Sequence, residues 1–515
     1  MKVALTVDDF IRRAELVYPD RVAVVDEPDQ PAESWGSITY QEMAERARAL
    51  AAGLDQLGIA EGERVAMVSH NSARLLTALF GVSGSGRVLV PINFRLAAEE
   101  VRYIIEHSGA RLLLVDPELA VALEGVKCER KMIIGADSDA ELLKFDTEPA
   151  HWNADEDATA TINYTSGTTA RPKGVQLTHR NVWINASIFG WHMGVTDRDV
   201  YLHTLPQFHC NGWGMLYAIT GMGAEHIILR KIDGVEILRR VEEHGVTLMC
   251  GAPAVLNAIL DAATEWEQQT GRPIPGRDRV RIVVAGAPPP TSTIERCETE
   301  LGWEFVQIYG LTETTPVITI NRNRSEYDDL TPGDRAVQLN RAGAPVVGCS
   351  MDVSSDGEIM ARGNMVMGGY WEQPDATAAA IRDGFFYTGD GGSIDNDNYV
   401  VISDRKKDVI VSGGENVSSI EVEDAIFRHP DVTEVAIIGV PNEQWGEQVT
   451  ALVVKTPGSD LSEADVISWT KSLLAGYKCP KQVDFRTELA RTATGKLQKF
   501  KLRQPFWEGH DRQIN

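Results

Sequence analysis

The strongest constraint on the fold is an alternation of buried-strand and amphipathic-helix patterns in the first half of the chain. Residues 62–70 have the apolar pattern of a buried strand, residues 71–82 that of a helix, and residues 87–93 that of a second strand. A helix pattern over 97–109 ends at a glycine, and 110–116 is typical of a further strand. Repeated β-α-β units of this kind predict a parallel sheet covered by helices.

The pattern changes after about residue 340, where short strands and turns replace the alternation. The charged residues 404–408 are followed by two helix patterns and two strand patterns, which are enough for a small α+β unit. We therefore expect an α/β fold with a large N-terminal domain over 1–404, built of β-α-β subdomains and a short β-rich subdomain. A small α+β domain over 405–515 is expected to follow it.

Charge and cysteine content exclude several classes of protein. The 515 residues carry a formal charge of −24, which argues against binding nucleic acid or an anionic membrane through the overall field. The six cysteines lie at least 40 residues apart, so we expect reduced thiols in a cytoplasmic protein, with neither a zinc motif nor a disulfide framework. We also expect no signal peptide, because the charged Asp8 and Asp9 come before any apolar region, and no membrane span, because no apolar run reaches about 18 residues.

The most informative segment is TSGTTARPKG at 165–174, which follows the strand-like residues 159–164. Its glycines allow backbone N–H groups to turn toward an anion, its hydroxyl side chains are neutral donors, and Lys173 adds a positive charge for phosphate. The segment is neither a Walker A loop nor a GxGxxG fingerprint. The residues that would face phosphate are Thr165, Ser166, Gly167, Thr168, Thr169 and Lys173.

This segment resembles the signature loop of the adenylate-forming superfamily, which contains acyl-CoA synthetases, luciferases and peptide-synthetase adenylation domains. Further motifs that resemble those of the family follow in the family's order: YGLTE at 309–313, YTGD at 387–390, DRKKDVI and SGGEN within 404–416, and TATGK at 492–496. PINFRL at 91–96 also fits. By this resemblance the small domain is mobile and turns about a hinge near 404–408, where Lys407 occupies the family's hinge position.

The resemblance implies two half-reactions that use ATP, Mg²⁺ and coenzyme A. A carboxylate attacks the α-phosphate of ATP, giving acyl-adenylate and pyrophosphate, and a thiol then displaces AMP. Since both reactants of the first step are anions, catalysis depends on positioning and charge neutralisation more than on proton transfer. Thr312 would then donate a hydrogen bond to phosphate, and Glu313 would ligate Mg²⁺. Lys496 would stabilise the transition state of the first half-reaction.

The other nucleotide contacts implied by the resemblance surround the adenosine. Tyr309 would stack on adenine, and Asp390, at a turn of the chain, would accept hydrogen bonds from the ribose. Because Gly391 and Gly392 follow Asp390, we expect this turn to be looser than in relatives. The remaining contacts would be Gly286, Ala287 and Pro288 as the opposite wall of adenine, Gln307 at its amino group, and Arg405 at the ribose. Ser412, Gly413, Gly414 and Glu415 would line the CoA tunnel.

The stretch PQFHCNGWG at 206–214 resembles the family's segment beside the acyl pocket, with His209 at the aromatic gate position. It contains no acidic residue to pair an ammonium group, which argues against an amino acid substrate. Acetate-specific relatives have a tryptophan where this chain has Gly310, so we expect an acid longer than acetate. The expected pocket lining is Trp191, Phe208, His209, Trp213, Ala285, Gly310 and Val317.

Within the family we expect an acyl-CoA synthetase for a short- or medium-chain fatty acid or a related acid. Three alternatives stay open: transfer of the acyl group to a carrier-protein phosphopantetheine, a luciferase-like oxygenase, and a catalytically inactive acyl- or nucleotide-binding protein. The expected partners are a small carboxylic acid, ATP and CoA, with no nucleic acid. A carrier protein and a homodimer stay open. Residues 478–503 carry eight basic and two acidic side chains, which suits a domain that closes over anionic substrates.

Overall fold

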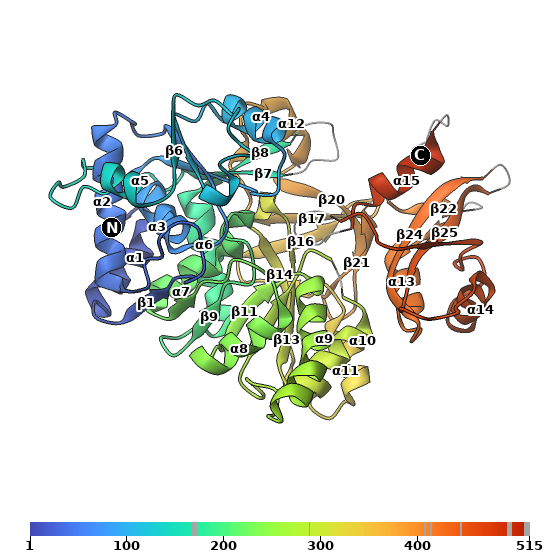
Figure 1. Cartoon of the computed structure of the whole chain (residues 1–515). Coiled ribbons are helices and arrows are strands. Elements are labelled where there is room, and N and C mark those ends of the chain that lie inside the picture. The colour runs from blue at the N-terminus through green and yellow to red at the C-terminus, as the bar shows by residue number, and fades with distance from the viewer. Residues whose placement is uncertain are drawn as a thin grey trace.

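Two mainly parallel sheets form the centre of a large body, and a small lobe stands beside it (Figure 1). The computed structural model of the chain describes residues 1–165, 172–287, 289–405, 408–412, 415–442, 445–491 and 497–508. The predicted site residues Ser166, Gly167, Thr168, Thr169, Pro288, Lys407, Gly413, Gly414 and Lys496 lie outside the described residues, and the side chain of Arg405 is likewise not described.

The first sheet has nine strands. In spatial order they are β15 (Ala344–Pro345), β14 (Val317–Asn321), β13 (Glu304–Gly310), β12 (Arg281–Val284), β11 (Leu248–Gly251), β9 (Val200–Leu202), β10 (Glu225–Ile227), β1 (Val22–Val25) and β2 (Ser37–Thr39). The strands from β13 to β1 run parallel, and antiparallel strands flank them at both edges.

The second sheet has seven strands and contains the predicted β-α-β units. In order they are β18 (Gly369–Tyr370), β8 (Lys173–Thr178), β7 (Thr159–Thr165), β4 (Val88–Ile92), β3 (Arg64–Val68), β5 (Leu112–Val115) and β6 (Arg130–Ile133). The strands from β7 to β6 run parallel. The predicted strands and helices of residues 62–116 are confirmed in type and order.

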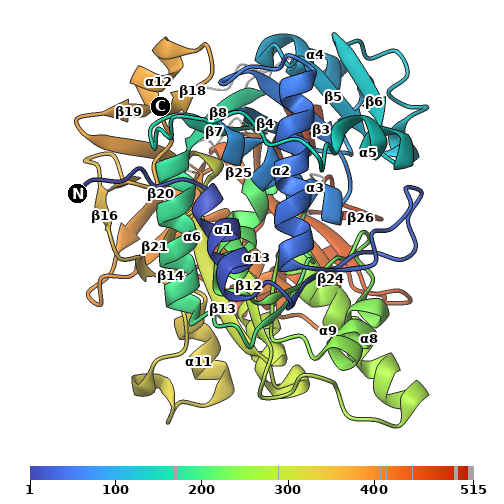
Figure 2. The same cartoon turned by 90° about the vertical axis from the view of Figure 1, so that its left-hand side faces the viewer.

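Helices cover the two sheets, and Figure 2 shows α1, α2 and α6 in front of the strands on the side away from the small lobe. The helices of the body are α1 (Asp8–Val17), α2 (Tyr40–Gln56), α3 (Ala73–Gly81), α4 (Ala98–Ser108), α5 (Ala136–Leu142), α6 (His179–Met193), α7 (Met215–Met222), α8 (Gly234–His244), α9 (Pro253–Thr270), α10 (Thr291–Arg296), α11 (Pro332–Leu339) and α12 (Pro374–Ala380). The side chain of Thr178 caps α6 by accepting from the N–H of Asn181, and left-handed Gly194 ends it. Among the described residues, no helix is long and apolar enough to cross a membrane.

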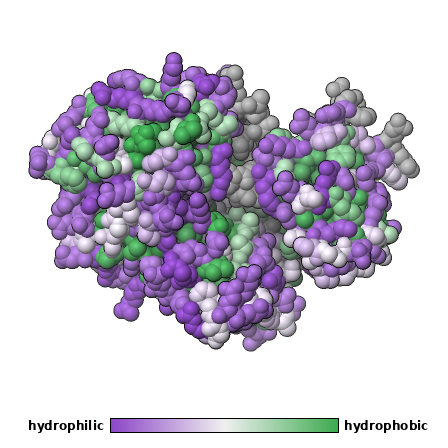
Figure 3. Space-filling view, viewed as in Figure 1, coloured by the Kyte–Doolittle hydropathy of each residue, from purple (hydrophilic) through white to green (hydrophobic). Residues whose placement is uncertain are grey.

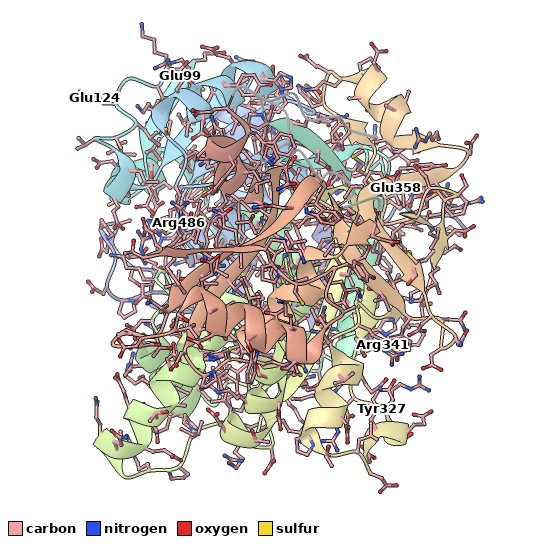
Figure 4. All side chains as sticks on the ribbon, turned by 90° about the vertical axis from the view of Figure 1, so that its right-hand side faces the viewer. Glu99, Glu124, Tyr327, Arg341, Glu358 and Arg486 are labelled. Carbon is pink, nitrogen blue, oxygen red and sulfur yellow. The ribbon has the colours of Figure 1, made fainter. Side chains whose placement is uncertain are left out.

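A third, antiparallel sheet forms the expected β-rich part of the body, and contains β16 (Cys349–Val353), β17 (Glu358–Gly363), β20 (Phe385–Ile394), β19 (Ile381–Arg382) and β21 (Val400–Arg405). Arg341 fastens it to the first sheet, because its guanidinium pairs with Asp395 at 2.7 Å, donates to the hydroxyl of Tyr327 at 2.6 Å and lies 4.1 Å from the ring centre of Tyr399. Arg341 and Tyr327 are labelled at the lower right of Figure 4.

The small lobe has its own sheet and its own apolar core. Its elements are β22 (Ile410–Ser412), β23 (Glu415–Val417), α13 (Ser419–Phe427), β24 (Val432–Asn442), β25 (Gly446–Lys455), α14 (Glu463–Leu473), β26 (Gln482–Arg486) and α15 (Lys499–Trp507). Val422, Ile437 and Ala451 in its core are fully buried. Figure 3 shows the two lobes as separate masses with mostly hydrophilic surfaces. The predicted α/β body with a small α+β C-terminal domain is confirmed.

One acidic side chain of the small lobe bonds directly to the body. Asp424 on α13 accepts from the backbone N–H of Thr291 at 3.0 Å and from its hydroxyl at 3.2 Å. Thr291 begins α10, shortly after the predicted adenine wall at 286–288. This contact holds the lobe against the part of the body that is expected to bind nucleotide.

A buried histidine pair links neighbouring strands β9 and β10. His203 Nε2 lies 3.0 Å from His226 Nδ1, and both side chains are fully buried. Gln207 accepts from the N–H of Ser72 through Oε1, so its amide nitrogen faces His203 Nδ1 at 3.1 Å. The hydroxyl of Thr220 lies 3.0 Å from His226 Nε2. This chain of bonds fits two neutral imidazoles.

These histidines predict a loss of stability in mild acid. Burial lowers the pKa of His226 to about 3 and that of His203 well below its ordinary value. An unfolded histidine titrates near 6.5, so the unfolded state takes up protons first, and stability present above pH 6.5 is lost as the pH falls toward 3. We expect the free energy of unfolding to drop by about 2 kcal/mol per histidine between pH 7.5 and pH 5, measured by urea denaturation. His226→Gln should show a smaller pH dependence, and an unchanged dependence would contradict the assignment.

Candidate active site

The residues predicted to hold adenine lie at the carboxyl ends of the parallel strands β12 and β13. Ala285, Gly286 and Ala287 follow β12 directly, and Tyr309 lies one residue before the end of β13. Gln307 shares a face of β13 with Tyr309 because strand side chains alternate. Its Oε1 is buried and has no hydrogen-bond partner among the described residues. This edge of a parallel sheet is where ligands bind in open α/β folds.

Tyr309 and Asp390, predicted separately for adenine and ribose, contact each other. The Tyr309 hydroxyl donates to Asp390 Oδ2 at 2.8 Å, and Asp390 is 7% exposed. The backbone register also sets Arg405 of β21 opposite Asp390 of β20. The three residues therefore meet although 96 positions separate the first from the last in the chain.

The prediction of a loose turn at Gly391–Gly392 is wrong. Both glycines continue strand β20, and a Cβ on Gly392 would collide with the carbonyl of Val401 in the neighbouring strand. The left-handed residue is Gly389, with a φ of 76°. Its N–H donates at 2.8 Å to Glu358 of β17, a buried carboxylate that the sequence did not indicate and that Figure 4 labels. Close strand packing, rather than flexibility, explains the glycine at residue 392.

On the phosphate side, a tyrosine joins two predicted residues. Thr165 ends β7 and pairs with Lys173 of β8, so the phosphate loop connects two neighbouring strands. Tyr370 of β18 donates its hydroxyl to Glu313 Oε1 at 2.9 Å, and Lys173 Nζ lies 4.5 Å from the centre of its ring. Burial and the neighbouring Glu313 raise the pKa of Tyr370, which keeps the hydroxyl protonated and donating.

Tyr370→Phe is expected to lower kcat/KM for ATP about tenfold or more, because a hydrogen bond to a charged group contributes about 1.5–3 kcal/mol. The phenyl ring keeps the contact with Lys173, so the loss reports the bond to Glu313. Steady-state kinetics at saturating acid measures it. Tyr477→Phe, which removes a half-exposed hydroxyl in the small lobe, is the control. Unchanged kinetics in Tyr370→Phe would contradict the role.

Residues 209–214, which we name the acyl turn, have an unusual backbone. Cys210, Asn211, Gly212 and Trp213 have φ values of 43°, 46°, 56° and 60°. Such left-handed conformations are unfavourable for residues other than glycine and persist only where surrounding contacts hold them. Cys210 Sγ lies 3.9 Å from the carbonyl oxygen of Thr312, so the turn contacts the predicted phosphate-binding segment. Burial raises the pKa of the Cys210 thiol, which suits packing rather than nucleophilic attack.

Asn185 of α6 holds the acyl turn against the start of β14. Its Nδ2 donates to the carbonyl of Trp213 at 3.0 Å, and its Oδ1 accepts from the N–H of Val317 at 3.1 Å. Asn185 is 2% exposed, and a Cβ on Gly214 would collide with it. An asparagine in the middle of an apolar helix is the signal that could have identified this residue in the sequence.

Four of the seven expected pocket residues are buried, His209 and Gly310 are half-buried, and one residue is largely exposed. Phe208, Trp213, Ala285 and Val317 are all less than 9% exposed. Trp191 was predicted to line the pocket and does not, since its side chain is 72% exposed. The neighbouring residues of α6, Gly190 and Met193, are the ones that face the core, and Trp191 lies on the outer side of the helix.

The structure gives each of four other predicted residues a packing or pairing contact. A Cβ on Gly310 would collide with the carbonyl of Pro316, so the close approach of backbone in this chain leaves no room for a side chain there. Ser412 and Glu415 pair across the hairpin of β22 and β23. His209 is half-buried, with its ring centre 6.5 Å from that of Phe208.

Comparison with known proteins identifies the family. The sequence model described as AMP-binding enzyme matches residues 11–371, and that of the AMP-binding enzyme C-terminal domain matches residues 421–496. The peroxisomal trans-cinnamate:CoA ligase of Petunia hybrida is 34% identical over 98% of this chain and 94% of its own. The 4-hydroxybutyrate–CoA ligase 2 of Metallosphaera sedula is 36% identical over 96% of this chain and 93% of its own.

Solved structures agree with this match. ATP-bound MatB from Rhodopseudomonas palustris has a TM-score of 0.83 at 29% identity, covering 98% of this chain and 99% of that one. The apo form of the same protein gives 0.74, with 98% and 100% covered. The chain therefore belongs to the AMP-binding enzyme family. It is a carboxylate–CoA ligase of the adenylate-forming class and uses ATP, Mg²⁺ and CoA, as the motifs predicted.

Proposed function

We propose that the protein activates a short- or medium-chain fatty acid, or a related acid, and transfers the acyl group to CoA. A carboxylate oxygen of the acid bonds to the α-phosphorus of ATP and pyrophosphate leaves. The CoA sulfur then bonds to the acyl carbon, and AMP and a proton leave. The observation that carries the proposal is the contact between Tyr309 and Asp390 at the ends of the parallel strands, 2.8 Å apart. It brings the residues for adenine and ribose into one site.

Several features support the roles of the nucleotide-binding residues. The buried Oε1 of Gln307, which has no partner among the described residues, lies on the face of β13 that carries Tyr309 and would accept from the adenine amino group. Asp390 accepts from the Tyr309 hydroxyl and would also accept from the ribose. Lys173, Thr165 and Thr312 would neutralise or bond the phosphates, and the side chain of Arg405 would reach the ribose.

Glu313 fits the role of metal ligand. It is a half-buried carboxylate that accepts from the Tyr370 hydroxyl, and carboxylate oxygens are the ligands that Mg²⁺ prefers. In the described part of the chain no three potential ligand side chains cluster, so phosphate oxygens and water would supply the other ligands. The ion would offset the negative charge of the phosphates when it is bound.

The acyl chain is proposed to lie against the acyl turn. Phe208, Trp213, Ala285 and Val317 offer an apolar wall there, with His209 as the gate. The turn carries no acidic side chain, which argues against an acyl group with an ammonium charge.

The small lobe is proposed to move between the two half-reactions. The hinge would lie at 404–408 with Lys407, dividing the chain into 1–404 and 405–515. Lys496 would face the carboxylate and α-phosphate first, and after rotation Ser412, Gly413, Gly414 and Glu415 would line the CoA tunnel. The structure matches ATP-bound MatB with a higher TM-score than apo MatB. This difference supports the proposal that the present arrangement of the two lobes serves adenylation.

ATP–pyrophosphate exchange tests the proposal across a panel of C2 to C16 and aromatic acids. We expect exchange to peak with short- or medium-chain acids. Exchange with none of the acids would overturn the proposal, and a preference for acetate or for long chains would overturn the acid class. Product analysis with CoA and with a carrier protein, offered separately, identifies the acceptor.

A further inference from the structure

A closed ring of three buried side chains joins β7 to the acyl turn. The hydroxyl of Thr161 donates to Asn163 Oδ1 at 2.9 Å, Asn163 Nδ2 donates to Asn211 Oδ1 at 3.2 Å, and Asn211 Nδ2 donates back to the Thr161 hydroxyl oxygen at 2.9 Å. Each member donates to the next and accepts from the previous one. The three residues are 0%, 3% and 1% exposed. None of them belongs to the nucleotide or acyl contacts proposed above.

The ring connects two segments that the reaction must keep aligned. Thr161 and Asn163 lie on one face of β7, whose last residue, Thr165, enters the phosphate loop. Asn211 lies in the left-handed acyl turn, and Asn163 Nδ2 also donates to the carbonyl of Phe208 at 3.1 Å, where the turn begins. One side of the ring is therefore fixed to the strand of the phosphate loop, and the other to the wall expected to hold the acid.

The acyl turn depends on contacts from outside itself. Its left-handed residues include Cys210 and Trp213, which do not favour that conformation alone. The ring holds its first half through Asn211, and Asn185 holds its second half at the carbonyl of Trp213. Buried amide networks with every member paired are rigid, and removing one partner leaves the others buried and unpaired.

We infer that Thr161, Asn163 and Asn211 are positioning residues that fix the acyl turn relative to the phosphate loop, so that the acid meets the α-phosphate of ATP in one geometry. The inference rests on the proposed acyl site. Alignment of this kind matters while acid and ATP are separate molecules. Once they are joined as acyl-adenylate, a small shift between the two segments no longer separates the reacting atoms.

Thr161 offers a matched pair of variants. Thr161→Val keeps the size and the β-branched shape but removes the hydroxyl, which opens the ring at two bonds. Thr161→Ser keeps the hydroxyl. The experiment measures acyl-adenylate formation from acid and ATP, and thioester formation from supplied acyl-adenylate and CoA, in full-length wild type and both variants. Asn211→Gly is the second variant, because it removes the same ring while glycine accepts the left-handed backbone.

If the ring aligns acid and ATP, opening it should slow the first half-reaction and leave the second unchanged. Thr161→Val and Asn211→Gly should form acyl-adenylate at least tenfold more slowly, with KM for ATP within about twofold of wild type. Thioester formation from supplied acyl-adenylate should stay within about twofold, and Thr161→Ser should resemble wild type in both assays. Equal loss in both half-reactions, equal behaviour of the valine and serine variants, or failure of both ring-opening variants to fold would overturn the positioning role. Failure of the proposed function is separable, because wild type itself would then form no acyl-adenylate.

Discussion

Lys496→Ala is expected to slow acyl-adenylate formation by about 100- to 1000-fold, the usual cost of removing one charged contact to a transition state. Thioester formation from supplied acyl-adenylate should continue at close to the wild-type rate. In the proposed mechanism the lysine neutralises the negative charge on the carboxylate and α-phosphate in the first step only. Rapid-quench measurement of each half-reaction checks the split.

The control for this variant is Lys501→Ala, which removes an exposed lysine of α15 five residues further along the chain. It should leave both half-reactions unchanged. On either side of residues 492–496, Arg491 and Leu497 pair as an antiparallel bridge, and Arg491 bonds to Glu434 at 2.6 Å. If Lys496→Ala slowed both half-reactions equally, the result would contradict a mechanism in which the small lobe takes a different position in each half-reaction.

Gly310→Ala is expected to destabilise the body by about 3 kcal/mol or more, in the upper range for overpacked sites. A Cβ at residue 310 would collide with the backbone carbonyl of Pro316, and a backbone atom cannot move aside as a flexible side chain can. The collision lies between β13 and the start of β14, so the shift would also reach Tyr309. Urea denaturation measures the loss, and ATP binding should weaken in parallel.

Gly125→Ala is the matched control, because a Cβ there has open space around it and the residue is exposed. It should be within about 0.5 kcal/mol of wild type. A stable Gly310→Ala protein with a narrower range of acids would show that the residue governs acid length and not strand packing.

The sequence predicted the fold class well because its signals were local. The strand and helix periods of residues 62–116 depend only on which side chains face the core, and left-handed Gly109 ends α4 as its position predicted. The contact between Tyr309 and Asp390 could not be predicted this way, because it depends on how the first and third sheets pack. Their separate roles came only from the resemblance to a family.

The errors and omissions have a common physical origin. Trp191 was placed in the pocket by its size and position in the chain, but an apolar residue on a helix faces the core only if its side of the helix does. Gly392 suggested a loose turn, whereas it serves close contact between strands. Asn163 and Asn211 were passed over because an isolated asparagine has no spacing that marks it, and only tertiary contacts reveal its partners. Asn185 had a signal, its place in an apolar helix, but that signal does not show which residues it bonds.

Asn163 and Asn185 hold the acyl turn by bonding to backbone atoms of the proposed pocket wall. Asn163 donates to the carbonyl of Phe208, and Asn185 bonds the carbonyl of Trp213 and the N–H of Val317. The side chains of Phe208, Trp213 and Val317 take no part in these bonds. Substituting them would therefore change the shape of the wall and leave the bonds intact. A scaffold of this kind can diversify its substrates while its framework stays constant.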